Sequence, residues 1–211
     1  MVIFLEREIR HMRRFAPSLL MIVLGLVSSS LLADWPTYLN NNARDGGTEE
    51  SLPRALAPAW VYSTPAAPEL AFSGPRNDPI EGKVMRHRVA FDRALQPVSA
   101  DGRVFFGSSV DHNLYCADAA SGELLWSFYT EAPIRLAPTL WQGKVYIGSD
   151  DHNVYALKND GEKLWSFPTG AEVRSSPAVG TDGTVYIGSH SKNIYALNGD
   201  TGVKKWEYAT D

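Results

Sequence analysis

A motif of about forty residues occurs three times in the second half of the chain, and this repeat limits the folds that the chain can adopt. Each copy contains a β-branched and aromatic run, a Gly-Ser pair, a tyrosine, a glycine and a tryptophan. The tyrosines are 40 residues apart, and the tryptophans are 39 and 41 residues apart. These positions are Tyr115, Tyr155 and Tyr195, and Trp126, Trp165 and Trp206. Such a period, built from short strands and glycine turns, is typical of β-propeller blades.

Each copy of the repeat predicts a four-stranded antiparallel sheet. In the second copy, residues 145–147 and 153–157 are β-branched and aromatic runs, which favour strands. Residues 148–152 between them are Gly, Ser, Asp, Asp and His, and several of these residue types form turns readily. A second turn, with a glycine, precedes the strand that carries the tryptophan. We therefore expect an all-β chain with blades at residues 95–135, 136–174 and 175–211.

The first 33 residues have the pattern of an export signal. Four arginines precede an uncharged, mostly apolar stretch at 16–33, and small residues lead up to Asp34. Three serines at 28–30 weaken the pattern of a membrane-spanning helix, which needs about 20 apolar residues. We expect residues 1–33 to be a cleaved signal peptide or, as the alternative, an uncleaved N-terminal anchor. The protein is therefore predicted to be exported to the periplasm or the cell exterior.

The charge balance limits the class of partner. The chain has 20 Lys and Arg against 24 Asp and Glu, a formal net charge of −4. Residues 1–33 hold four arginines and two glutamates, so the remainder carries −6. Because a nucleic-acid surface requires clustered basic residues, we predict no nucleic-acid partner. The single cysteine, Cys116, cannot form an intrachain disulfide, and we expect it to be a small buried residue.

Residues 34–64 form a leading segment. Strong turn signals follow Asp34-Trp35-Pro36, and Trp60 stands in a short run that matches the tryptophan strand of a blade. In many propellers an N-terminal strand completes the last blade and hides two sheet edges, and we predict this closing role for Trp60. Residues 65–94 are rich in proline and interrupt the repeat, so we expect an insertion loop at one face.

The turn before each tryptophan resembles the docking motif of the PQQ-like propeller repeat, roughly Ala-x-Asp-x-x-Thr-Gly-x-x-x-Trp. The first copy matches this motif with Ala117, Asp118 (offset by one), Ser121, Gly122 and Trp126. The third copy matches it with Ala196, Asn198, Thr201, Gly202 and Trp206. The second copy keeps Ala156, Gly161 and Trp165 and has no counterpart of the threonine.

The resemblance implies that each tryptophan packs against the neighbouring blade and its turn. We therefore expect a structural docking role for Trp60, Trp126, Trp165 and Trp206 and for Gly122, Gly161 and Gly202.

Proteins with this repeat fall into two functional groups. The first is the quinoprotein alcohol and sugar dehydrogenases, which hold pyrroloquinoline quinone (PQQ) and a calcium ion. The second is non-catalytic scaffolds, such as the BamB lipoprotein. The paired cysteines of the dehydrogenases, the Cys-x-x-Cys-His haem motif and the lipid-accepting cysteine of BamB are all absent from this sequence. We therefore predict no cofactor, and PQQ with calcium only under the dehydrogenase alternative.

Two equivalent turns carry candidate contact residues. Asp111 and His112 lie in the first copy and Asp151 and His152 in the second, and both residue types are metal ligands. The third copy has Ser and Lys at these positions, and turn chemistry alone explains an aspartate there. We predict ordinary hairpin turns, with a binding surface at the rim as the alternative, and no metal site.

Two arginines, Arg135 and Arg174, precede the second and third blades at matching positions. Because this segment leads into the innermost strand of a blade, both arginines are expected near the central channel, where they can contact an anionic ligand or a partner. The alternative is surface ion pairing with Glu131 and Glu172. No nucleophile elbow and no phosphate-binding loop occurs, so we predict no catalytic residue.

Three blades leave two sheet edges open, whereas propellers typically have four to eight blades. We expect the chain to be part of a longer propeller or, alternatively, to complete a ring by self-association. The predicted function is a non-enzymatic exported scaffold that binds proteins or peptides through rim loops or exposed strand edges. The alternative is part of a PQQ- and calcium-dependent dehydrogenase.

Overall fold

The computed structural model describes residues 34–41, 43–48, 57–64, 79–80, 83–84 and 95–210. The predicted signal peptide at 1–33 and most of the predicted insertion loop lie outside these residues. The described residues form strands and turns and contain no helix, and hence no helix that could cross a membrane. The all-β prediction is confirmed for this part of the chain.

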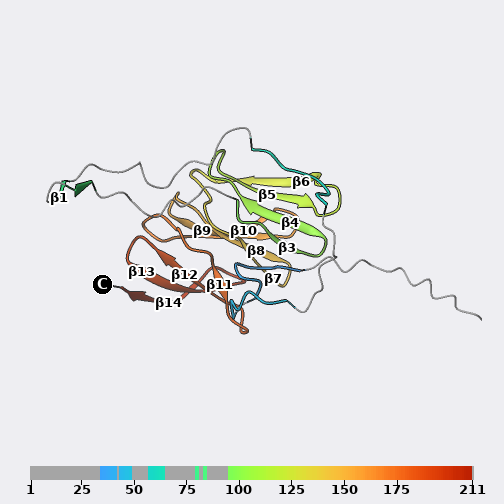
Figure 1. Ribbon diagram of the computed structural model, residues 1–211. Helices are drawn as coiled ribbons and strands as arrows, with labels where there is room; N and C mark the ends of the chain where they lie inside the picture. Colours follow the sequence, from blue (N-terminus) through green and yellow to red (C-terminus); the bar gives the residue numbers. More distant parts are fainter. Residues whose placement is uncertain are drawn as a thin grey trace, which may run out of the picture. The chain divides into compact units, whose positions relative to one another are not determined.

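Three four-stranded antiparallel sheets follow one another along the chain (Figure 1). The first contains β3 (Val98–Ala100), β4 (Arg103–Gly107), β5 (Asn113–Asp118) and β6 (Leu124–Tyr129). The second contains β7 (Thr139–Trp141), β8 (Lys144–Gly148), β9 (Asn153–Lys158) and β10 (Lys163–Pro168). The third contains β11 (Ala178–Val179), β12 (Thr184–Ser189), β13 (Asn193–Asn198) and β14 (Lys204–Ala209). We call these sheets blades 1, 2 and 3.

The three blades have the same internal register. Strands pair only with their neighbours in the chain, and each tryptophan pairs with a small residue of the third strand. The pairs are Trp126 with Cys116, Trp165 with Ala156, and Trp206 with Ala196. A register irregularity next to each pair occurs in all three blades. The repeat in the sequence is therefore a repeat in geometry as well.

Two hydrophobic clusters fill the spaces between consecutive blades, because alternate residues of a strand point to opposite faces. In β8, Val145 and Ile147 join the cluster shared with blade 1, whereas Tyr146 joins the cluster shared with blade 3. Blade 1 supplies Val98, Phe105, Leu114 and Cys116 to the first cluster, and blade 3 supplies Val185, Ile187, Tyr195 and Leu197 to the second. The innermost strands β3, β7 and β11 also contact one another in this order.

The tryptophan of blade 2 docks on the turn that joins the third and fourth strands of blade 3. Trp165 donates its indole N–H to the carbonyl of Gly199 over 2.9 Å and is 8% exposed. Gly202 lies beneath the ring, and a β-carbon added there would stand 2.7 Å from Cδ2 of Trp165. Burying roughly 200 Å² of an aromatic side chain contributes on the order of 5 kcal/mol before entropy costs.

Two further tryptophans dock in the same way on the equivalent turns of blades 2 and 1. Trp126 of blade 1 donates to the carbonyl of Asn159 in blade 2 over 3.0 Å. Trp60 of the leading segment donates to the carbonyl of Ala119 in blade 1 over 2.9 Å and covers Gly122. Trp60 therefore occupies the place that the tryptophan of a preceding blade would take.

The last tryptophan has no such turn to cover among the described residues. Trp206 is 47% exposed, and all six residues of β14 are exposed. Residues 57–64 form no strand, so the described chain shows the docking of Trp60 but no pairing with a final blade. The arrangement of the three blades is open rather than closed, as expected for an incomplete propeller.

The leading segment runs along the innermost strands of the blades. Trp35 pairs with Ser99 of β3 in an antiparallel bridge, and the carbonyl of Pro36 accepts the N–H of Leu140 in β7. The hydroxyl of Thr37 contacts that of Thr139 over 3.0 Å, and Thr139 donates to a carbonyl before β11. The segment thus ties all three blades together at their inner edge, which the sequence did not predict.

The predicted insertion loop contains one described element. Strands β1 (Pro79–Ile80) and β2 (Lys83–Val84) pair with each other in an antiparallel ladder. A strand of two residues is too short to show an alternating pattern, so the sequence did not predict this hairpin.

The docked glycine provides a test of the tryptophan contact. Gly202→Ala is expected to destabilise the protein by about 1–3 kcal/mol more than Gly143→Ala, because the new methyl group meets Trp165. Gly143 is a matched control, since its φ of +72° equals the +71° of Gly202 within a degree and nothing lies within 4 Å. Urea denaturation monitored by fluorescence measures both variants. Equal losses would mean that only the backbone conformation matters.

Candidate functional site

A buried cluster of charges joins blades 2 and 3 at the rim formed by the turns between second and third strands. Asp150, in the turn between β8 and β9, accepts from Nε of Arg135 over 2.5 Å. It also accepts from Nε and Nη2 of Arg174, over 2.9 and 3.1 Å. The side chains of Arg135 and Asp150 are each 7% exposed, and that of Arg174 is 17% exposed. We call these three residues the arginine–aspartate cluster.

The local chain positions explain why the three residues meet. The arginines lie in the segments that lead into β7 and β11, and these segments reach the same rim as the turn after β8. The amide of Asp150 also donates to the carbonyl of Pro133, which holds the turn against the segment of Arg135. Glu172 lies 3.7 Å from Arg174 and brings the local charge close to balance.

The predicted pairing of the arginines is therefore partly different from the observed one. Glu172 does approach Arg174, but the main partner of both arginines is Asp150, and Glu131 instead donates its amide to Asp151. The sequence contains one signal that points to Asp150. Among the three equivalent turns, only that of blade 2 has an acidic residue directly after Gly-Ser.

The two Asp-His pairs lie in hairpin turns, and in each turn the aspartate accepts a hydrogen bond from a tyrosine of the same blade. Asp111 accepts from the hydroxyl of Tyr115 over 2.5 Å, and Asp151 accepts from that of Tyr155 over 2.7 Å. Burial acts to raise the pKa of Asp111, but hydrogen bonds from Ser108 and Tyr115 hold it below its ordinary value. Burial and the nearby carboxylate raise the pKa of Tyr115 well above its usual range.

The histidines stabilise the same turns through backbone hydrogen bonds. His112 has a φ of +59° and His152 a φ of +72°, and each carbonyl accepts from a threonine at the end of the fourth strand. The ring of His112 stacks on Tyr129 with centroids 6.3 Å apart, and His152 is exposed. Within the described ranges, no group of three or more His, Cys, Asp or Glu side chains could hold a metal ion.

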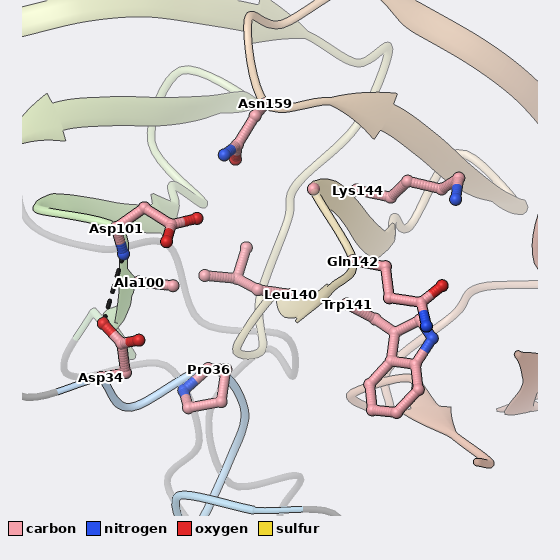
Figure 2. Close-up of a pocket in the computed structure, with 10 residues that line it drawn as sticks. Asp34, Pro36, Ala100, Asp101, Leu140, Trp141, Gln142, Lys144 and Asn159 are labelled. Carbon is pink, nitrogen blue, oxygen red and sulfur yellow. Dashed lines mark hydrogen bonds between the residues drawn. The ribbon is translucent and has the colours of Figure 1, made fainter.

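A pocket of about 290 Å³ opens at the opposite rim, between blades 1 and 2 and the leading segment. Figure 2 shows Asp34 and Asp101 on one side, joined by a hydrogen bond, and Gln142 and Trp141 on the other. The amide of Asn159 points toward Asp101, whereas the side chain of Lys144 extends away from the pocket.

The charged groups that line the pocket are two carboxylates, Asp34 and Asp101, and the ammonium group of Lys144. Carboxylates are ligands for calcium, whereas the three carboxylates of PQQ need cationic partners. Lys144 is engaged with Asp200 over 2.9 Å. The guanidinium group of Arg103, which is half-buried, donates to the backbone carbonyl of Asn159 in the pocket lining over 2.6 Å.

The geometry and the repeat define a PQQ-like β-propeller protein, and comparison with known families agrees. The family model described as the outer membrane protein assembly factor BamB matches residues 83–211, more than half of the chain. The chain therefore belongs to this family. No curated protein matches it.

Three solved structures to which the chain is similar are an alcohol dehydrogenase, a BamB protein and a computationally designed protein. The quinohemoprotein alcohol dehydrogenase ADHIIG from Pseudomonas putida HK5 is 23% identical with a TM-score of 0.49, over 53% of this chain and 20% of that one. BamB from Moraxella catarrhalis is 23% identical with a TM-score of 0.45, over 51% and 33%. The computationally designed Ika8 protein is 17% identical with a TM-score of 0.51, over 58% and 38%. The matched part spans less than two fifths of each of these structures, and identities this low concern the fold alone.

Removal of the Asp150 carboxylate, which both arginines share, should destabilise the folded protein. Asp150→Asn is expected to lower the free energy of unfolding by about 3 kcal/mol, because two mostly buried guanidinium groups lose their counter-charge. Asp200→Asn removes the partner of Lys144 at a 76% exposed side chain, and we expect less than about 0.5 kcal/mol. Chemical denaturation at pH 7 compares the two, and similar losses would show that the cluster contributes no more than a surface pair.

The turn of blade 1 should make stability depend on pH. The native pKa of Asp111 is lowered, so its charge stabilises the fold above the ordinary value near 3.8, and this stabilisation is lost as pH falls through the native value. Asp111→Asn is expected to lower Tm by about 2–4 °C at pH 7. The difference from the unmodified protein should shrink as the pH falls below the ordinary value near 3.8. A difference that is constant with pH would contradict the role of the charge.

Proposed function

We propose that the protein is a non-enzymatic, exported scaffold that binds a protein or peptide partner. The observation that carries this proposal is that the aspartates and arginines of the rim bond to side chains of their own blades and of the segments that join them. Asp111 and Asp151 accept bonds from tyrosines of their own blades, and Asp150 pairs with the two arginines. General acid–base or nucleophilic chemistry needs such groups to converge on open space instead.

The proposed contact surface is the rim that carries the turns after β4, β8 and β12. His152, His190 and Lys192 are exposed there, and His112 is half-buried. The arginine–aspartate cluster lies at the same rim, so Arg135 and Arg174 act mainly by holding the turn of blade 2 in position. Rigidly held loops are well suited to binding, because little conformational entropy is lost when a partner docks.

The family supports the class of partner and the compartment. Its model is named for an outer membrane protein assembly factor. The predicted export signal at 1–33 agrees with an envelope location. We therefore propose a location in the periplasm or at the cell exterior, with other envelope proteins as partners.

A site-specific photo-crosslinker tests the proposed surface. Placed at His152 in cells, it is expected to give one discrete product with an envelope protein, identified by mass spectrometry. Lys163 is the matched control, because it is exposed on the same blade at the opposite end of the fourth strand. Equal products at both positions, or none at His152, would contradict binding at this rim.

Titration with PQQ and calcium separates the scaffold from the alternative, part of a quinoprotein dehydrogenase. The scaffold predicts no change in the near-ultraviolet absorbance of the quinone and no rise in Tm on adding both ligands. Saturable binding with a rise in Tm would favour the dehydrogenase, since a ligand that binds the folded state stabilises it.

A further inference from the structure

The pocket between blades 1 and 2 and the leading segment has no part in the proposed rim function. It lies at the rim opposite the turn that carries His152, and its volume is about 290 Å³. Pockets for small molecules typically measure about 300–1,000 Å³. This pocket therefore suits one side chain or a ligand of similar size.

Two carboxylates lie next to each other in the pocket wall. Asp34 of the leading segment accepts from the backbone N–H of Asp101 over 3.2 Å, as Figure 2 shows. Asp101 stands in the turn between β3 and β4 with a φ of +52°, which aspartate and asparagine adopt more readily than most residues. Within the described part of the chain, neither carboxylate forms an ion pair.

The cations near the pocket have other partners. The ammonium group of Lys144 pairs with Asp200 over 2.9 Å, and its side chain extends away from the pocket (Figure 2). The guanidinium group of Arg103 donates to the backbone carbonyl of Asn159 and not to a carboxylate. The two carboxylates thus outnumber the one nearby cation that no acid pairs, and the pocket favours a positively charged ligand.

The rest of the lining matches the hydrogen-bonding pattern of a guanidinium group. Such a group has five N–H donors and no acceptor, and its planar fork fits carboxylates. Asn159, whose amide points toward Asp101, and Gln142 on the opposite wall each supply an amide oxygen that can accept. Leu140 and Pro36 add apolar surface, which suits the methylene groups of an arginine. An ammonium group has only three donors and would leave more of these acceptors without a partner.

We propose that this pocket binds a guanidinium group, either that of an arginine side chain in a partner protein or that of free arginine. Asp34 and Asp101 hold the planar fork of the group. The amide oxygens of Asn159 and Gln142 accept from its remaining N–H groups. The proposal does not depend on the rim function, because loss of guanidinium binding leaves crosslinking from His152 unchanged.

Titration of the full chain, followed by two-dimensional ¹H–¹⁵N NMR, tests the proposal. N-acetylarginine amide is expected to shift the backbone amide of Asp101 and the indole N–H of Trp141 in a saturable way, since both residues line the pocket. N-acetylcitrulline amide has nearly the same shape without the charge and should not bind. Free arginine distinguishes the sources: tighter binding of the blocked form indicates an arginine within a protein, and tighter binding of the free form indicates a small molecule.

Three substitutions give the titration its controls. Asp101→Asn is expected to weaken binding about tenfold, because a charge-assisted hydrogen bond is lost while asparagine keeps the turn. Lys144→Met should tighten binding about twofold to threefold, because it removes a positive charge from the lining. Glu123→Gln is the matched control, since it removes an exposed carboxylate of blade 1 outside the pocket and should change nothing.

The proposal would be overturned if N-acetylarginine amide gave no saturable shifts, or if the citrulline derivative bound equally well. Equal weakening by Asp101→Asn and Glu123→Gln would also contradict it, because the effect would then be one of overall charge. Calcium that shifts the same amides while the arginine derivative does not would assign the carboxylates to a metal ion instead. If Asp101→Asn does not fold, Lys144→Met decides, and binding no tighter than that of the unmodified protein would refute the site.

Discussion

The packing of a tryptophan on a glycine turn of the following blade is the interaction on which the rest of this structure depends. A single four-stranded sheet of this size cannot bury both of its faces, so each blade is stable only when its neighbour covers it. Trp165 shows how the contact combines two requirements. Its ring needs the bare backbone of Gly202, and its N–H needs the carbonyl of Gly199. Turns of two lengths provide both, since Trp126 makes the same contact on the turn of blade 2, which is one residue shorter.

Two other sets of contacts also join the blades that the tryptophans pack together. The leading segment ties the inner edges of the blades through Trp35 and Thr37, and the arginine–aspartate cluster ties blades 2 and 3 at one rim. These polar contacts add little hydrophobic stabilisation. They fix the position of neighbouring blades, since a shared carboxylate is satisfied in only one arrangement of its two arginines. A rim held in this way keeps a fixed shape.

Much of the fold was predictable because each copy of the repeat corresponds to one blade. The second and third strands, the turns after them and the tryptophan strand follow from residue types at fixed spacing, as Val145 to Ile147 and Trp165 illustrate. The candidate site was only partly predictable. Arg135 and Arg174 were recognisable by their matching positions. Their common partner Asp150 stands out as an acidic residue after Gly-Ser, but that signal does not say which side chains, 15 and 24 residues away, it contacts. The short β1–β2 hairpin was missed, since two residues carry no period.

The sequence by itself determined the class of fold, the number of blades in this part of the chain and the residues that join them. Local propensity and spacing are enough for this, because every blade repeats the same short-range pattern. Only the tertiary structure decided which contacts are completed. It placed Trp60 on blade 1 and left Trp206 exposed, although both stand in nearly identical sequences. The physical reason is that burial depends on what lies across the interface, and a residue's own segment does not contain that information.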